Sequence, residues 1–315
     1  MLTIAPLTIS QLLTEEKERW HSLLEKKYWP CLDGKDPWGV NDSVIVAVGA
    51  SDKEVPVAIL VATFRKPTRH ALILNLYVEP DFRHRKIGTQ LLILLEAILV
   101  EQGCSLVTYV YQSDLPTTIY LEKILNQLGW GEGFPFSIRC HFNRIEFSPD
   151  WLNIDYHLPK GYQIFHWKNL RLKEKKQLER DLQKEWIPPS VSPFHQQETI
   201  DPNFSLGLRK DGRVIGWVIV NRFSEGMLQY SSLYIEREYK FLGYSIHLLA
   251  ASIRLVKKSN VEGAFLELNL QESDNSWIRF VKRRLVPDSF RVDRFKESYH
   301  SIGNLYPSED EDRFT

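Results

Sequence analysis

The sequence predicts an α/β protein built from two consecutive domains of similar fold. The 315 residues exceed one typical domain, and a hydrophobic content of 43% is enough for two packed cores. Segments with strand-like and helix-like patterns alternate along the chain. The pattern of the first half returns in the second half at a constant distance of 157 residues, the separation of Trp29 and Trp186 (186 − 29).

The first half follows the order strand, helix, hairpin, strand, helix, strand. Its predicted elements are a strand at 1–6, a helix at 9–27, hairpin strands at 43–48 and 55–64 around a loop at 49–53, a strand at 71–78, a helix at 87–102, a strand at 106–111, a helix at 116–128 and a closing strand pair within 136–147. Pro80 ends the strand at 71–78 because proline cannot donate to a sheet ladder. A loop rich in Pro, Gly and Asp occupies 29–41.

The second half repeats this order. The offset of 157 relates Val57 to Val214, Val78 to Ile235 and Arg83 to Lys240. It predicts a strand at 162–167, a helix at 170–184, and hairpin strands at 204–208 and 214–221 around the strong turn signal Lys210-Asp211-Gly212. We therefore expect an N-terminal domain at 1–150, a C-terminal domain at 158–307, and a solvated acidic tail at 308–315.

The stretch 76–92 has the pattern strand, sharp turn, helix. From Ile87 onward the apolar residues recur at helical spacing, which places Arg83, Arg85 and Lys86 just before the helix N-terminus. That end carries free backbone N–H groups and positive partial charge. The segment is suited to bind an anion, and we predict that the anion is a diphosphate. The alternative is a basic first turn of a surface helix.

The order Val-x-Pro-x-x-Arg-x-x-Lys-x-Gly-x-x-Leu-Leu from Val78 to Leu92 resembles the acyl-CoA-binding motif of the GCN5-related N-acetyltransferases (GNAT), usually Gln/Arg-x-x-Gly-x-Gly/Ala. Arg83 stands at the first motif position and Gly88 at the last, whereas Lys86 replaces the middle glycine. The resemblance covers nearly the whole chain and implies a tandem member of this superfamily. It also implies that each domain is a mixed, mostly antiparallel sheet with splayed central strands, flanked by helices.

The second copy keeps a different part of the motif. Lys240 takes its first position, Gly243 supplies the middle glycine, and Ser245 replaces the last small residue. The resemblance therefore favours the first half as the acyl-CoA site. The residues expected to bind the donor there are Tyr77, Val78, Arg83, His84, Arg85, Lys86, Ile87, Gly88 and Thr89.

The resemblance implies direct attack of an amine on the thioester of acetyl-CoA or a longer acyl-CoA. Such chemistry needs a base, because a free lysine amine has a pKa of about 10.4. Glu79, which follows the central strand, is the candidate base, with His84 in the turn as an alternative. The structural alternative for both is an exposed surface charge.

Many members of the family supply a tyrosine as acid, four residues before the glycine of a Gly-Phe pair. Here the pair is Gly129-Trp130, and Leu125 occupies the acid position. Tyr111 and Tyr120 are the candidate substitutes, with packing in the core or at the rim as the alternative. In the second half the offset places Lys282 at the acid position, and the residues nearest the corresponding site are Tyr230, Glu267 and Asn275, for which we expect packing or capping roles.

Composition narrows the class of partner. Forty basic and forty acidic residues give a net charge of zero, which argues against general attraction to nucleic acid or a membrane surface. The three cysteines are widely spaced, without a zinc-type cluster, so no metal is predicted. The longest apolar run, 91–100, is interrupted by Glu96 and is too short to span a bilayer. We expect a cytoplasmic protein. The helix that contains this run could support a homodimer, but burial against its own sheet is the expected role.

The predicted function is transfer of an acetyl or other acyl group from a CoA thioester to an amine, carried by a small molecule or a peptide. One alternative is a fatty-acyl transferase that lipidates a peptide side-chain amine. A second is a catalytically inactive acyl-CoA-binding or scaffolding protein, an alternative that the missing acid tyrosines leave open.

Overall fold

The computed structural model describes residues 2–7, 17–25, 28–29, 42–154, 157–184, 186–187, 191–194 and 196–303. The chain divides into two compact units. Unit 1 is formed by residues 1–136 and 295–315, and unit 2 by residues 137–294. Most of the expected loop at 29–41, both ends of the helix at 9–27 and the acidic tail at 308–315 lie outside the described residues.

Unit 1 contains a mixed sheet with the strand order β1-β2-β3-β4-β5-β12. All neighbours run antiparallel except β4 and β5, which are parallel. Its elements are β1 (Leu2–Pro6), α2 (Lys17–Ser22), β2 (Ser43–Asp52), β3 (Val55–Arg65), β4 (His70–Val78), α4 (Ile87–Glu101), β5 (Leu106–Gln112), α5 (Thr118–Gln127) and β12 (Arg291–Ser301).

Two hydrophobic clusters cover opposite faces of this sheet. The buried residues of α4, which include Leu91, Leu95 and Leu99, recur every four residues and pack in the cluster that contains Ala71 and Ile73 of β4. The region around α2 packs in a separate cluster with strand residues whose side chains alternate with the first set. The sheet of unit 1 is therefore buried on both sides.

Unit 2 repeats this arrangement with the strand order β6-β11-β10-β9-β8-β7, in which only β10 and β11 are parallel. Its elements are β6 (Phe134–Asn143), β7 (Tyr162–His166), α6 (Leu172–Gln183), β8 (Leu206–Lys210), β9 (Arg213–Ser224), β10 (Met227–Ile235), α7 (Tyr244–Lys257), β11 (Gly263–Asn269) and α8 (Asn275–Phe280). Buried residues of α7 form the main core of the unit with the strands.

The predicted duplication is confirmed element by element. Corresponding elements begin 157 residues apart: β4 at 70 and β10 at 227, α4 at 87 and α7 at 244, β5 at 106 and β11 at 263, α5 at 118 and α8 at 275, and β6 at 134 and β12 at 291. The two repeats thus share one fold without an insertion between β4 and the last strand.

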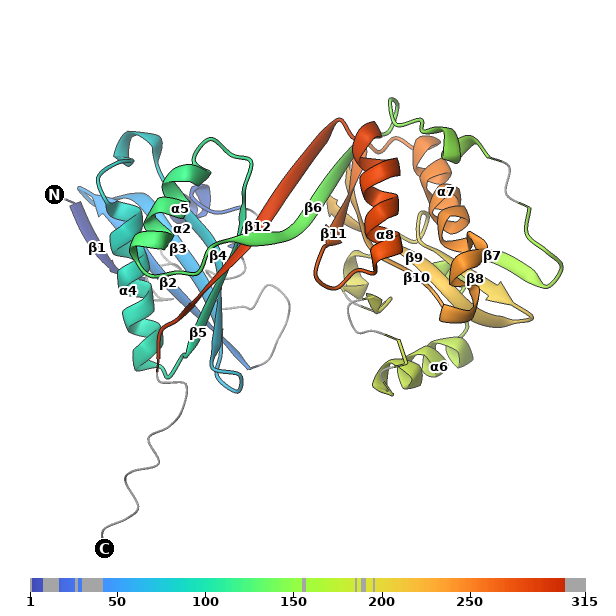
Figure 1. The fold of residues 1–315 in the computed structure, drawn as a ribbon, viewed down its shortest axis with the longest axis horizontal. Coiled ribbons are helices and arrows are strands. Elements are labelled where there is room, and N and C mark those ends of the chain that lie inside the picture. The colour runs from blue at the N-terminus through green and yellow to red at the C-terminus, as the bar shows by residue number, and fades with distance from the viewer. Residues whose placement is uncertain are drawn as a thin grey trace, which may run out of the picture. The chain divides into compact units, whose positions relative to one another are not determined.

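The last strand of each repeat joins the sheet of the other unit. Residues 137–143 of β6 pair with β11 in unit 2, whereas residues 295–301 of β12 pair with β5 in unit 1. Figure 1 shows β12, in red, running to β5 in the unit that holds the blue and cyan strands. The expected closing strand pair within 136–147 is therefore wrong: this segment holds one strand, whose partner is β11. For the same reason each compact unit combines residues of both repeats.

The first hairpin turns later than expected. Its loop was predicted at 49–53, but β2 extends to Asp52, and the turn consists of Lys53 and Glu54, both with positive φ (49° and 70°). Gly49 marks a close contact instead, because a Cβ there would lie 2.4 Å from the Trp20 ring. The second hairpin turns at Asp211-Gly212, as predicted. The remaining predicted elements, apart from the helix at 9–27, agree within three residues at each end.

Candidate active site

The two parallel strands at the centre of unit 1 separate after a short contact. Their pairing runs from His70–Leu106 to Ile73–Tyr109, although β4 continues to Val78 and β5 to Gln112. A one-residue shift in the pairing of β3 with β4 bends β4 at Leu74. Beyond Ile73 the backbone groups of β4 that face β5 therefore have no strand partner. This confirms the expected splay.

The N-terminus of α4 lies at the wide end of this opening, because β4 leads to α4 through a short 3-10 turn at Pro80–Phe82. Two residues with left-handed backbone, His84 and Lys86 (both φ 62°), shape the turn. The first three amides of α4 have no partner within the helix, and no side chain caps them. A Cβ on Gly88 would meet other atoms only at 3.8 Å or more, so packing does not require glycine there.

The basic side chains of this turn differ in their roles. Arg83 is half-buried and donates from Nε to the Val78 carbonyl oxygen (3.0 Å), which ties the turn to the end of β4. Arg85 is exposed, donates to the Asp81 carbonyl oxygen and covers the Phe82 ring at 5.0 Å. The side chains of His84 and Lys86 are exposed at the same turn. A diphosphate could recruit them without breaking the anchor formed by Arg83.

The end of β4 carries a phenol and a carboxylate in contact. The Tyr77 hydroxyl donates to Oε2 of Glu79 at 3.3 Å. Burial raises the pKa of Tyr77, and the charge of Glu79 raises it further. Tyr77 packs in the cluster on the α2 side of the sheet, whereas Val78 packs on the α4 side. The candidate base is therefore oriented by a tyrosine that the resemblance assigned to donor binding.

Tyr111 is buried and bound to a group that sequence reasoning missed. Its hydroxyl donates to Oε1 of Glu122 (3.1 Å), and Lys296 of β12 donates to the same oxygen (2.7 Å). Burial, followed by the charge of Glu122, raises the pKa of Tyr111. A Cβ on Gly133 would lie 2.1 Å from this hydroxyl, so Tyr111 points toward the β12 side of β5. These contacts favour a structural role for Tyr111.

Tyr120 lies near the turn that precedes α4. It is exposed at the start of α5, and its ring contacts the ring of His84 edge-on at 4.9 Å. The structure therefore brings these two predicted site residues together, while Tyr111 belongs to a different cluster.

A third tyrosine, Tyr109, stands at the vertex of the splay. It is the last residue of β5 paired with β4 and is buried. Burial raises its pKa, the nearby charges of Tyr28 and Glu25 add to this, and a hydrogen bond with the Leu76 backbone opposes it. Tyr109 thus closes the narrow end of the opening. No pattern in the sequence marks Tyr109 for this role, since the residue lies inside a predicted buried strand.

The corresponding turn in unit 2 is closed by an ion pair. Nζ of Lys240 lies 2.5 Å from Oδ2 of Asp274, which also caps α8 by accepting from the amides of Ser276 and Trp277. Partial burial alone would raise the pKa of Asp274, but the hydrogen bonds from Lys240 and Ser276 lower it to about 2. Thr117 occupies the equivalent position in unit 1. An anion at the second turn would have to displace the Asp274 carboxylate, whereas an anion at the first would not.

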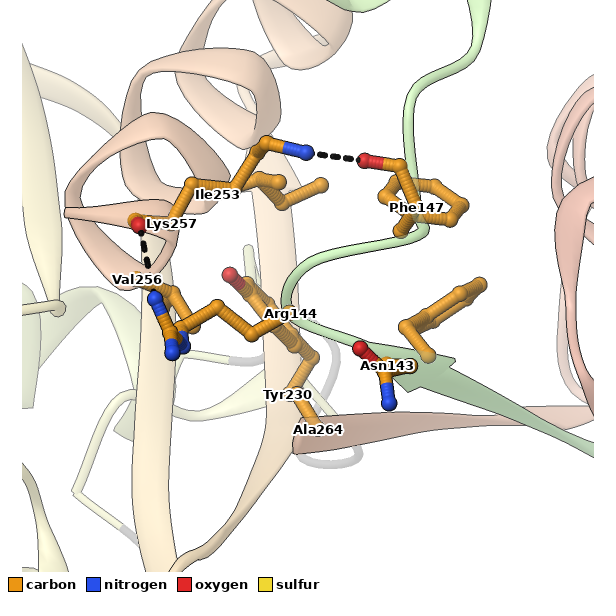
Figure 2. A pocket seen from close by; sticks show the side chains of 9 residues that line it. Asn143, Arg144, Phe147, Tyr230, Ile253, Val256, Lys257 and Ala264 are labelled. Atoms are coloured by element: carbon orange, nitrogen blue, oxygen red, sulfur yellow. Dashed lines mark hydrogen bonds between the residues drawn. The ribbon is translucent and has the colours of Figure 1, made fainter. Parts of the chain in front are cut away.

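The other candidates in unit 2 have protein partners. Tyr230 is buried and accepts a hydrogen bond from Ser252, Glu267 binds Ser137 and Arg139, and Asn275 follows the capping residue of α8. Figure 2 shows Tyr230 at a cavity of about 20 Å³ between β10 and α7, lined mainly by apolar side chains. This space suits one water molecule. Arg144 also lines it, and the buried Nε of Arg144 has no partner among the described residues.

Two further observations concern the described ranges only. No three His, Cys, Asp or Glu side chains gather there in a way that could hold a metal ion. No helix in those ranges is long and apolar enough to cross a membrane.

A helix N-terminus beside two splayed parallel strands, present twice in one chain, defines an acetyltransferase-type α/β protein with tandem domains. The acetyltransferase (GNAT) family model matches residues 8–125 and again residues 167–285, so the chain belongs to this family. A search of curated proteins found no significant match.

Solved structures support the same fold. A tandem GNAT protein from the clavulanic acid biosynthesis pathway is similar with a TM-score of 0.64 and 14% identity, over 98% of this chain and 100% of that one. A GCN5-related N-acetyltransferase from Sphaerobacter thermophilus is similar with a TM-score of 0.62 and 14% identity, over 96% of both chains. At these identities the likeness concerns the fold and not the substrate.

Proposed function

We propose that this protein is an acyl-CoA-dependent N-acyltransferase that binds its donor in unit 1 and transfers a short acyl group to an amine. The observation that carries the proposal is the contrast between the two turns: the α4 N-terminus opens onto unpaired strand edges, whereas Asp274 closes its counterpart. Family membership supports acyl transfer in general.

The residues of unit 1 fit the donor's diphosphate. The amides of Ile87, Gly88 and Thr89 point out of the helix end, where the macrodipole adds about half a positive charge. Lys86, Arg85 and His84 supply exposed polar groups around that end, while Arg83 holds the turn against β4. Electrostatic attraction and backbone hydrogen bonds would act together here.

The open edge of β4 fits the pantetheine arm. Beyond Ile73 the β4 backbone has no strand partner on the β5 side, and its groups that are not bonded to Tyr109 or Arg83 can form strand-like hydrogen bonds with an extended amide-containing chain. Tyr77 and Val78 would flank this arm on opposite sides of the sheet. The arm would run from the α4 N-terminus toward the vertex, where Tyr109 stands.

The bound thioester supplies an activated carbonyl carbon and a thiolate leaving group. An ammonium acceptor first loses one proton, for which Glu79 is the proposed base, held by Tyr77. The amine nitrogen then forms the C–N bond as the C–S bond breaks, so one ammonium ion and one thioester give an amide, free CoA thiol and one proton. Tyr120, exposed beside His84, is better placed than the buried Tyr111 to serve as proton donor.

The vertex favours a short acyl group. Tyr109 and Ile73 are both buried at the point where β4 and β5 meet, which leaves little depth for a long chain. This supports acetyl-CoA over the fatty-acyl alternative. The second repeat, whose own turn is closed, would contribute the strand β12 to unit 1. A cytoplasmic location and a homodimer are further proposals that stand on the sequence alone.

The first test is unfolding stability with saturating CoA, acetyl-CoA, decanoyl-CoA and palmitoyl-CoA. A ligand at about 100 times its Kd adds roughly 2.7 kcal/mol. We expect a shift with CoA and acetyl-CoA that shrinks as the acyl chain lengthens. A stability shift that grows with acyl chain length would favour the fatty-acyl transferase. The absence of a shift with any of these ligands would favour the catalytically inactive scaffolding protein.

Charge reversal then tests the choice of unit. We expect Arg83→Glu and Lys86→Glu to abolish the shift with acetyl-CoA, and Lys240→Glu, the matched control in unit 2, to retain it. Lys86→Glu leaves the hydrogen bond between Arg83 and Val78 intact. A lost shift in this variant would therefore reflect the changed charge and not a disrupted turn. If both unit 1 variants kept the stability shift with acetyl-CoA and Lys240→Glu lost it, the donor site would be assigned to unit 2 instead.

A further inference from the structure

A carboxylate from the exchanged strand lies level with the vertex of the splay. Glu297 of β12 pairs directly with Val110 of β5. Val110 is the first residue of β5 beyond its last contact with β4, at Tyr109. Neighbouring strands are about 4.8 Å apart, so Glu297 stands one strand away from the place where the thioester would lie.

Glu297 occupies the face of the sheet opposite α4. Tyr109 and Tyr111 pack in the cluster on the α4 side, so Val110 between them points to the other face. Directly opposed residues of an antiparallel pair share a face, which places Glu297 with Val110. On this face the cluster around α2 covers residues of β2, β3 and β4, but it includes none of β5 or β12. An acceptor can therefore approach the thioester over β5 and β12 from this side, whereas α4 and its buried leucines fill the other.

The charge of Glu297 has no compensating group within the part of the chain described. Its side chain is half-buried, yet no hydrogen bond or ion pair to its carboxylate occurs among the described residues. Four other half-buried glutamates bind a cationic side chain: Glu122 with Lys296, Glu174 with Arg209, Glu236 with Arg213 and Glu267 with Arg139. Two more accept hydrogen bonds from neutral donors, Glu79 from Tyr77 and Glu96 from Trp130. Burial raises the pKa of Glu297. The Glu297 carboxylate can therefore bind a cation, and the described residues do not supply one.

We propose that Glu297 binds the ammonium group of the acceptor and holds it beside the thioester in unit 1. This inference rests on the proposed function. It narrows the acceptor to a primary amine that is charged when it binds and can enter from the face opposite α4. It also means that the second repeat supplies an acceptor-binding residue to the site of the first.

Direct binding tests the proposal without relying on turnover. The full-length chain is titrated calorimetrically, with CoA present, against n-butylamine, putrescine and Nα-acetyl-lysine amide. We expect at least one amine to bind the wild type and to bind Glu297→Gln at least tenfold more weakly. Glu297→Asp should recover part of the affinity. Failure of all three amines to bind, or equal binding by Glu297→Gln, would overturn the proposal.

Two controls separate this result from damage to the fold or the donor site. Tyr299→Phe changes the next residue on the same face of β12 and should bind the amine like wild type. The stability shift with acetyl-CoA should be the same in wild type and Glu297→Gln. In acyl-transfer assays with the amine that binds, Glu297→Gln should raise KM at least tenfold and change kcat less than threefold. If acetyl-CoA does not stabilise the wild type, the proposed function is wrong, and this result does not depend on the amine titrations.

Discussion

Nζ of Lys296 lies 2.7 Å from Oε1 of Glu122, although 174 residues separate them in the chain. Glu122 belongs to the first repeat and Lys296 to the second, and the exchanged strand brings them into one unit. The same oxygen accepts the Tyr111 hydroxyl. The contact therefore joins the helix α5, the strand β5 and the strand β12.

Loss of this contact should weaken unit 1 modestly. Both side chains are about one third exposed (33% and 38%), so screening limits the expected cost of Lys296→Met to about 0.5–1 kcal/mol. Urea unfolding with and without 0.5 M salt measures it, and added salt should shrink the difference. Lys282→Met, at an exposed position of unit 2, is the control and should have no effect. Equal costs for the two variants would contradict a specific role for Lys296.

Removal of the exchanged strand should disable donor binding although every motif residue is retained. A chain that ends at residue 290 lacks the strand that pairs with β5, so it exposes the edge of β5 and loses Lys296 from the Tyr111 cluster. We expect no stabilisation by acetyl-CoA and a tendency to aggregate. A chain that ends at residue 303 keeps β12 and should respond like the full protein. Normal acetyl-CoA binding by the shorter chain would show that unit 1 does not need β12.

The ion pair between Asp274 and Lys240 should make the free energy of unfolding depend on pH. Its pKa in the folded protein, about 2, lies below the ordinary value of 3.8, so the folded state favours the charged form. The contribution is fully present above pH 4 and is lost as the pH falls toward 2. Asp274→Asn retains a capping side chain but removes the charge. The stability difference between wild type and this variant, measured by urea unfolding from pH 7 to pH 3, should be constant at first and then shrink below pH 4. A difference independent of pH would exclude the ion pair as its source.

Two glycines should respond in opposite ways to an added methyl group. In Gly49→Ala the Cβ would lie 2.4 Å from the buried Trp20 ring, and we expect a loss of about 1–3 kcal/mol. In Gly88→Ala the nearest atom is 3.8 Å away, and the helix should gain up to about 1 kcal/mol. Urea unfolding of both variants checks this. A large loss for Gly88→Ala would mean that the turn before α4 is tighter than described.

Local patterns were enough to predict most of the fold. The turn at Pro80, the spacing of Leu91 and Leu95, and the offset of 157 residues each reflect a physical constraint that acts over a few positions. The exchange of strands could not be predicted in this way. β6 and β12 occupy corresponding positions in the two repeats, so each has the same pattern whichever sheet receives it.

The candidate site was predictable only where it is continuous in sequence. The segment from Tyr77 to Thr89 carries its own strand, turn and helix signals, and the structure places it at the splay. By contrast, Glu122 binds Lys296, which is 174 positions away, and Glu297 pairs with Val110 of the other repeat. A lone glutamate on a half-buried strand has no distinctive pattern, and only the missing cation around Glu297 marks it.

The exchange of strands also orders events during synthesis. Domains generally fold as they leave the ribosome, N-terminal first. Here the sheet that contains the earliest residues gains its last strand only when residues 295–301 have emerged, after the whole of unit 2. Until then β5 is an open edge, which is a template for pairing with another nascent chain. Synthesis of the second half thus sets how long the open edge of β5 stays exposed to misassembly.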